Sequence, residues 1–128
     1  ILIWALAAHN LEPRLVESLP WILLNFHDLD TTWLIRESKI RDIQNRLGFI
    51  VSMAYEIATK NTGYCERTNP LTALLDTLNR SRLVHQDTLC EEGITPRIRK
   101  ALLQSQSIAA EHWGIVTGWK AEHFKYDF

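Results

Sequence analysis

Two cysteines and two of the histidines are the residues of this sequence that could hold a metal ion. They are Cys65, His85, Cys90 and His112. Zinc is bound by cysteine thiolates and histidine nitrogens, and its ligands usually occur as pairs that are close in the chain. The spacings here match no zinc template, and there is no Cys-x-x-Cys pair. The sequence therefore favours four separate core or surface residues and predicts no bound metal or cofactor.

A cysteine nucleophile is the second chemistry that these residues suggest, with Cys90 as the thiol and His85 or His112 as its base. A reactive cysteine needs an electropositive and partly exposed environment. Cys90 follows Leu89 in a segment that we expect to be helical, where a buried and inert thiol is the commoner case. We therefore predict no catalytic residue. An enzyme of unrecognised type stays as an alternative, and its site would comprise His85, Asp87, Cys90 and His112.

Carboxylates near the start of the chain could support general acid–base catalysis, and they are Glu12, Glu17, Asp28 and Asp30. Such catalysis needs two carboxyl groups at a fixed distance in a cleft. Asp28 and Asp30 precede an expected helix, whose dipole favours negative charge at its N-terminus for structural reasons alone. The sequence has no GxGxxG, GxxxxGK(S/T), HExxH or GxSxG motif, which counts against nucleotide-dependent and common hydrolytic chemistry.

Basic residues form two clusters that could contact phosphates. Arg36 and Lys39 are three residues apart, so they share one face of an expected helix. The alternative is a solvated face on which the basic residues pair with Glu37 and Asp42. The net charge of the chain is −1, so nucleic-acid binding would have to depend on a local patch. The first cluster comprises Arg36, Lys39, Arg41 and Arg46, and the second comprises Arg97, Arg99 and Lys100, with Arg80 and Arg82 as further candidates.

The chain has five tryptophans in 128 residues, and Trp113 and Trp119 lie in its last segment. Tryptophan is enriched in protein interfaces as well as in cores. These two side chains are therefore candidates for a surface that meets a partner. The alternative is that the last segment folds back and covers the core, and the sequence favours neither.

Helices must position these side chains, because apolar residues recur at helical spacing along most of the chain. Pro20 is expected to kink the first amphipathic helix, and Gly48 is the weak point of the longest one. Thr95–Pro96 has the pattern of an N-cap followed by proline in the first turn. The expected helices cover 11–25, 32–60, 70–91 and a segment that begins at Thr95–Pro96.

The remaining segments are expected to be irregular. Residues 61–69 show no apolar period, which predicts a loop. The C-terminal segment, 111–128, is interrupted by Gly114 and Gly118, and we expect it to pack across the bundle. Ile115–Val116–Thr117 has the composition of a brief strand, but a lone strand without a partner is not expected to form.

Length and composition predict one domain over residues 1–128. With 46% hydrophobic and 23% charged residues, the chain can bury a core without disulfides or metals. No apolar run approaches the roughly 20 residues that span a bilayer, so no membrane partner is expected. Two cysteines are too few for a disulfide framework and indicate a cytoplasmic protein with reduced thiols, with a single bridge as the alternative in an oxidising compartment. The chain begins without methionine inside an apolar run over 1–8, which reads as the end of a buried helix, so a native N-terminal segment is expected to be missing.

The predicted fold is therefore an all-α, single-domain bundle of about five helices with an irregular aromatic C-terminal segment. A resemblance adds to this interpretation. It is carried by Leu11-Glu12-Pro13-Arg14-Leu15, Leu19-Pro20-Trp21, Gln44-Asn45-Arg46-Leu47-Gly48-Phe49, Asp87-Thr88-Leu89-Cys90 and Glu111-His112-Trp113. This set resembles a family of small bacterial helical proteins that we associate with the antitoxin-like partners of two-gene toxin–antitoxin modules.

The resemblance spans most of the chain and implies neutralisation of a toxin by direct binding, together with promoter binding by the module. It carries over no catalytic residue. Its polar positions, Arg14, Gln44, Asn45 and Arg46, are ones that could hydrogen-bond across the bundle or meet a partner.

Three functions follow as hypotheses, and the partner's identity and a homo-oligomeric state stay open in all of them. The first is a non-enzymatic, antitoxin-like interaction protein that binds and neutralises a cognate toxin, and its partner-binding residues would be Arg14, Arg36, Lys39, Gln44, Arg46, Trp113 and Trp119. The second is a transcriptional regulator or nucleic-acid-binding accessory protein that contacts DNA through Arg36, Lys39, Arg97, Arg99 and Lys100. The third is the enzyme of unrecognised type described above.

Overall fold

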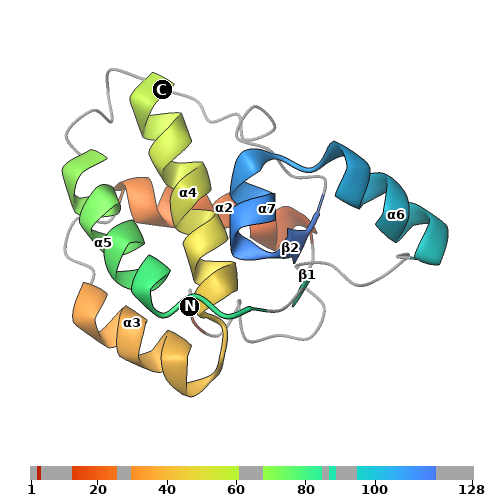
Figure 1. Ribbon diagram of the computed structural model, residues 1–128. Helices are drawn as coiled ribbons and strands as arrows, with labels where there is room; N and C mark the ends of the chain where they lie inside the picture. Colours follow the sequence, from red (N-terminus) through yellow and green to blue (C-terminus); the bar gives the residue numbers. More distant parts are fainter. Residues whose placement is uncertain are drawn as a thin grey trace.

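The structure is a computed structural model that describes residues 3, 13–25, 30–60, 68–84, 87–88 and 95–117. It confirms an all-α bundle, to which a pair of two-residue strands is added (Figure 1). None of the helices in the described ranges is both long enough and apolar enough to cross a membrane. The elements are α2 (Pro13–Asn25), α3 (Thr31–Ile40), α4 (Gln44–Lys60), α5 (Thr68–Arg80), β1 (Asp87–Thr88), α6 (Pro96–Ser105), α7 (Ile108–Trp113) and β2 (Ile115–Val116).

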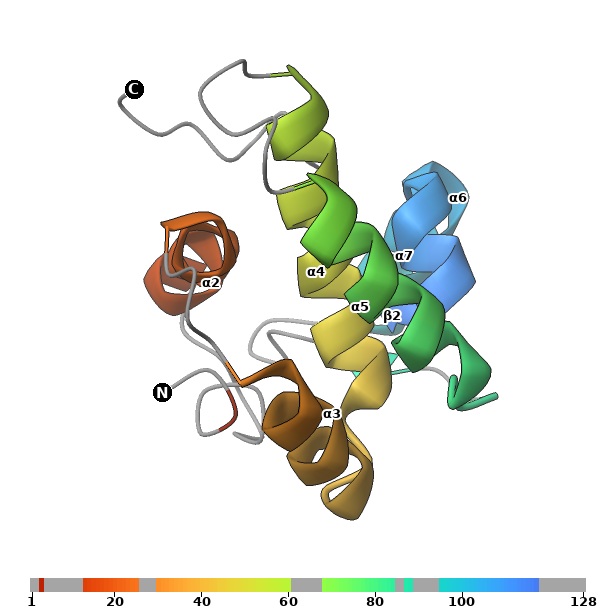
Figure 2. The same ribbon diagram turned by 90° about the vertical axis from the view of Figure 1, so that its left-hand side faces the viewer.

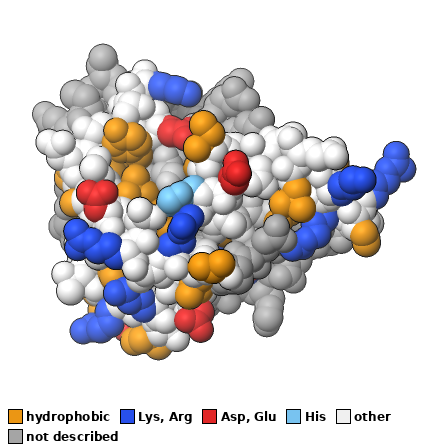
Figure 3. Space-filling view, in the orientation of Figure 1, with side chains coloured by type: hydrophobic (Ala, Val, Ile, Leu, Met, Phe, Trp, Pro, Cys, Tyr) orange, Lys and Arg blue, Asp and Glu red, His pale blue; other side chains and the backbone are white. Residues whose placement is uncertain are grey.

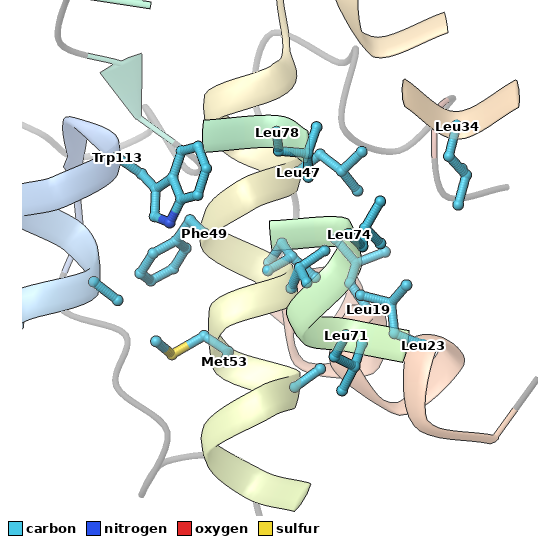
Figure 4. Packing of buried hydrophobic residues seen from close by; sticks show 14 of the residues in the cluster. Leu19, Leu23, Leu34, Leu47, Phe49, Met53, Leu71, Leu74, Leu78 and Trp113 are labelled. Carbon is cyan, nitrogen blue, oxygen red and sulfur yellow. The ribbon is translucent and has the colours of Figure 1, made fainter. Parts of the chain in front are cut away.

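Helix α4 is the centre of the bundle. Helices α2, α5 and α7 pack against it from different sides, and α3 lies across its beginning (Figures 1 and 2). Every residue from Gln44 to Val51 is buried, which is the pattern of an internal helix rather than of a surface helix with one apolar stripe. The core side chains interdigitate around it (Figure 4). They include Leu19 and Leu23 of α2, Leu34 of α3, Phe49 and Met53 of α4, Leu71, Leu74 and Leu78 of α5, and Trp113 of α7.

The single long helix predicted over 32–60 is wrong, because the chain leaves the helix after Ile40 and begins α4 at Gln44. Asp42 adopts a left-handed conformation with a φ of 55°. The amide of Asp42 donates to the carbonyl of Lys39 and that of Ile43 to the carbonyl of Ser38. This is the Schellman pattern, which satisfies the last carbonyls of a helix, and aspartate is one of the few residues that tolerate the left-handed position.

The helix predicted over 70–91 is shorter than expected, since α5 ends at Arg80. Residues 87–88 instead form β1, which pairs in parallel with Ile115–Val116 of β2. The brief strand at 115–117 was expected to fail for lack of a partner, and the structure supplies that partner from a distant part of the chain. A two-residue pairing adds little stability itself, but it joins the segment after α5 to the segment after α7.

Capping residues define the two helices that follow β1. Thr95 Oγ1 accepts a hydrogen bond from the Ile98 amide at 3.2 Å, and Pro96 occupies the first turn of α6. The predicted start of this helix is therefore confirmed. It ends at Ser105, and Ser107 then caps α7, which ends at Trp113 and is followed by Gly114 with a φ of 65°. The predicted irregular segment is thus helical at its beginning, and residues 118–128 lie outside the described residues.

The expectations for the N-terminal half fare as follows. The helix predicted over 11–25 is confirmed as α2, and it runs through Pro20. Asp30, interpreted as a structural charge before a helix, is the N-cap of α3 and accepts from the Trp33 amide at 3.0 Å. Of the buried helix end expected over 1–8 only Ile3 is described, as a helical and buried residue. The expected loop over 61–69 lies mostly outside the described residues.

Candidate functional site

The first turn of α4 holds the chain that follows α5. Asn45 Nδ2 donates to the Leu83 carbonyl at 2.8 Å, and the Leu83 amide donates back to Asn45 Oδ1 at 2.8 Å. Gln44 Nε2 donates to the Ser81 carbonyl at 3.1 Å. These side chains therefore satisfy backbone groups of an irregular segment in the way that a neighbouring strand would.

We call the contacts of Gln44, Asn45 and Arg46 with the chain that follows α5 the clasp. Arg46 extends it to β1. Its Nε lies 2.6 Å from Asp87 Oδ2 and its Nη2 lies 2.9 Å from Asp87 Oδ1, which is a bidentate pair. The side chains are 8% and 21% exposed, so the pair is shielded from water. The Asp87 amide donates to the Gly114 carbonyl at 2.8 Å, which carries the connection on to the end of α7. Of the charged residues considered for a solvated face, Glu37 and Arg41 do form an ion pair on α3.

Trp113, which lies beside α4 in Figure 4, packs against Gly48 of that helix. The ring is buried, and its Nε1 donates to Ser52 Oγ at 2.9 Å. A Cβ at position 48 would lie 2.5 Å from ring carbons of Trp113, so only glycine admits the ring at this place. The predicted weak point of the helix is therefore a close-packing site for α7.

A polar chain on the surface joins α5 to α7 beside this clasp. His112 Nε2 lies 2.7 Å from Asn79 Oδ1, and Arg82 Nη1 donates to the His112 carbonyl at 2.7 Å and lies 3.4 Å from His112 Nδ1. Because Asn79 Oδ1 is an acceptor and Arg82 Nη1 a donor, these contacts fit a neutral imidazole with its proton on Nε2. Desolvation of the ring, and then the positive charge of Arg82, lower the pKa of His112 below 6.5.

The lowered pKa of His112 predicts an acid-sensitive component of stability. The unfolded chain takes up a proton near pH 6.5, whereas the folded chain takes it up at a lower pH. The contribution of His112 to the free energy of unfolding is therefore fully present above pH 6.5, and it decreases as the pH falls from 6.5 toward the lower pKa of the folded state. We expect the urea midpoint of the wild type to drop more between pH 7.5 and pH 5.5 than that of His112→Gln. An equal drop in both proteins would contradict the assignment.

A half-open pocket of about 380 Å³ lies beside Arg82 and His112. It is bounded by the segment 82–84, the end of α6, α7 and β2. In Figure 3 a histidine and a basic side chain meet in the middle of the visible face. The polar lining of the pocket comprises Arg82, Gln106, Glu111 and His112, and its apolar lining comprises Leu83, Val84, Leu103, Ile115 and Val116.

Helix α6 is the second surface feature of the described chain. None of its residues is buried, and its main neighbour among the described elements is β2. It projects from the bundle in Figure 1, and basic side chains lie over it in Figure 3. Ile98 and Leu102 are one turn apart on one face, and Arg97 and Lys100 lie on another. The helix thus presents apolar and positively charged groups to solvent together.

The residues assigned to partner binding do not form one surface. Gln44, Arg46 and Trp113 are buried and make the intramolecular contacts described above. Arg36 and Lys39 are exposed on α3. The side chain of Arg14, on α2, and the whole of Trp119 lie outside the described residues.

The two sets assigned to nucleic-acid contacts are also separate. Arg36 and Lys39 lie on α3, whereas Arg97, Arg99 and Lys100 lie on α6, at the opposite end of the molecule (Figure 1). A single nucleic-acid site would therefore use one set or the other.

The residues considered for metal binding or catalysis are only partly described. Cys65, His85 and Cys90 lie outside the described residues. Asp87 pairs with Arg46, and His112 contacts Asn79 and Arg82, so these two side chains belong to different networks. In the part of the chain that the structure describes, no three His, Cys, Asp or Glu side chains gather as a metal site would require.

The pocket was not predicted from the sequence. Arg82 was considered only as a basic residue, and Glu111 only as part of a familiar string. Asn79 and His112 are 33 residues apart, and no periodic pattern connects residues at such a separation.

Comparison with protein-family models, with curated proteins and with solved structures finds no match. The resemblance to antitoxin-like proteins therefore stays a prediction.

Proposed function

We propose that the chain is a non-enzymatic interaction protein that binds and neutralises a cognate protein partner, in the manner of an antitoxin, through α6. The observation that supports this proposal is that α6 is amphipathic and yet buries none of its residues. Ile98 is 44% exposed, and Ala101 and Leu102 on the same face are not buried either. A partner that covers this face would remove apolar area from water, which is the main driving force of protein association.

The length of α6 supports the same proposal. It has 10 residues, and isolated helices of fewer than about 12–15 residues are marginal in water. Most helical stability in proteins comes from packing of an apolar face, and in α6 the face of Ile98, Ala101 and Leu102 is only lightly packed. Docking into a groove would supply the missing contacts, with Ile98, Ala101 and Leu102 as anchors at the i, i+3 and i+4 positions.

The charge of α6 indicates the kind of partner. The helix contains Arg97, Arg99 and Lys100 and no acidic residue. A complementary groove would be apolar at its centre and acidic along its rim. Nucleic acid would be satisfied by the basic residues alone and would gain little from exposed Ile98, which is why we favour a protein.

The test uses the product of the neighbouring gene as the probe. Co-expression of the two proteins should restore growth, and the two should purify together. Replacing Ile98 with aspartate should weaken binding at least about tenfold, because a buried apolar anchor becomes a charge in an apolar groove. Ile40→Asp is the matched control, since Ile40 is an isoleucine that is 67% exposed on α3.

Three outcomes would contradict the proposal. A neighbouring product that is harmless, or that does not bind, would leave nothing to neutralise. Equal binding by the two isoleucine variants would place the interface elsewhere. A purified chain that is a dimer, and that Ile98→Asp converts to a monomer without any effect of the neighbour, would assign α6 to self-association.

A nucleic-acid-binding function is the second candidate, and the exposed basic residues of α3 favour it. A gel shift with duplex DNA at low ionic strength should then show an affinity that falls steeply with salt. Arg36→Glu combined with Lys39→Glu should abolish the shift, whereas Ile98→Asp should leave it unchanged. A duplex that is not shifted at low ionic strength would exclude this function.

A further inference from the structure

The pocket beside α6 combines a positioned cation with an apolar wall. Arg82 and Leu103 both line it, and they come from segments that are about 20 residues apart in the chain. Leu83, which also lines the pocket, is bound by Asn45, but Arg82 and Leu103 take no part in the contacts of Gln44, Asn45 and Arg46. The presence of these two side chains at the pocket is therefore not explained by those contacts.

The guanidinium of Arg82 is held in place at the edge of this pocket. Its Nη1 donates to the His112 carbonyl at 2.7 Å, and His112 is itself held by Asn79 at 2.7 Å. A guanidinium has five N–H donors, and these contacts use Nη1 alone. The other donors remain for a ligand, and the guanidinium makes no ion pair with any carboxylate of the described residues.

Two other lining residues of the pocket are apolar and accessible. Val84 is 99% exposed and Leu103 is 36% exposed. The volume of about 380 Å³ is near the lower end of the range for small-molecule sites, which is about 300–1,000 Å³. A ligand of the size of an amino acid suits this volume better than a cofactor such as a dinucleotide.

We propose that this pocket binds a small apolar carboxylate, whose carboxyl group pairs with Arg82 while its apolar body covers Val84 and Leu103. Arginine is suited to this role because its planar donors match the two oxygens of a carboxylate. The ligand would be a free apolar amino acid or the C-terminal residue of a peptide, which share this chemistry.

Glu111 distinguishes these two sources. It also lines the pocket, and its carboxylate would attract the ammonium group of a free amino acid. A ligand without an ammonium group would experience only the repulsion between its own carboxylate and that of Glu111. Glu111→Gln should therefore weaken the binding of leucine and strengthen that of N-acetyl-leucine, which represents the end of a peptide. Tighter binding of leucine than of N-acetyl-leucine by the wild type would indicate a free amino acid, and the reverse would indicate the end of a peptide. Both results support the proposal, because both require the carboxylate on Arg82.

Titration calorimetry of the purified chain with leucine, N-acetyl-leucine and leucinamide provides the test. Leucine or N-acetyl-leucine should bind, whereas leucinamide, which lacks the carboxylate, should not. Arg82→Gln should weaken binding about tenfold or more, since a charge-assisted hydrogen bond is lost. Arg80→Gln is the matched control, because Arg80 is an exposed arginine two residues away that does not line the pocket.

A second variant keeps the test decisive if Arg82→Gln does not fold. Leu103→Trp adds volume at an exposed position and should fill the pocket and abolish binding. Binding of leucinamide as tight as that of N-acetyl-leucine, equal binding by Arg82→Gln and wild type, or no heat with either carboxylate would overturn the proposal. Ile98 does not line the pocket, so this result is independent of the partner test on α6.

Discussion

Replacing Asp87 with alanine is expected to destabilise the fold by about 3 kcal/mol, the largest effect of any single change considered. The substitution leaves the Arg46 guanidinium buried without the carboxylate that pairs with it, and an uncompensated buried charge is costly. It also loosens β1, whose pairing with β2 joins the segment after α5 to the segment after α7. Urea unfolding followed by circular dichroism at neutral pH measures the change.

Two further variants separate this cause from a simple loss of contacts. Glu37→Ala breaks the exposed pair with Arg41 on α3 and should change stability by less than about 1 kcal/mol. Arg46→Met combined with Asp87→Ala should be more stable than Asp87→Ala alone, because no charge is then left buried. A double variant that is less stable than the single one would show that the guanidinium is not the source of the penalty.

Replacing Gly48 with alanine should destabilise the protein by about 2 kcal/mol, although alanine is the better helix former by about 1 kcal/mol. The new Cβ would lie 2.5 Å from ring carbons of Trp113. The ring cannot move away easily, because it is buried and its Nε1 is bound to Ser52. Thermal or urea unfolding of the variant measures the balance of the two effects.

A double-mutant cycle with Trp113→Leu tests this explanation. The leucine side chain is smaller than the indole, so alanine at position 48 should then be tolerated or even stabilising. If Gly48→Ala costs the same in both backgrounds, the clash with Trp113 is not its cause. The cycle therefore reports directly on whether Gly48 exists to admit α7 against α4.

The clasp around α4 changes the interpretation of the polar residues that the sequence singles out. The sequence left Gln44, Asn45 and Arg46 either to hydrogen-bond across the bundle or to meet a partner, and the structure directs all three toward the chain itself. Their substitution would reduce function by unfolding the protein, and it would not identify a binding surface. Surface variants on α6 and at the Arg82 pocket avoid this ambiguity.

Hydrophobic periodicity was sufficient to predict the helical class, the position of α2 and the start of α6. These depend on local properties, namely the spacing of apolar residues and the capping preference of Thr95 and Pro96. The break at Asp42 was missed because the apolar spacing continues through it. A left-handed residue interrupts the hydrogen bonds of a helix without changing which residues are apolar.

The candidate sites could not be predicted in the same way. The pocket brings residues 82–84 against residues between 103 and 116, and the clasp joins Arg46 to Asp87 across 41 positions. Periodicity carries no information about such pairings, because each partner would fit its own local structure equally well with another neighbour.

By itself, the sequence determined that this chain folds as helices with buried leucine and isoleucine faces, since those preferences act over a few residues. Only the tertiary structure decided which polar residues are internal and which are presented to solvent. The physical reason is that burial depends on what packs over a side chain. For Arg46 that is a segment some 40 residues away, and for Ile98 little packs over it among the described elements.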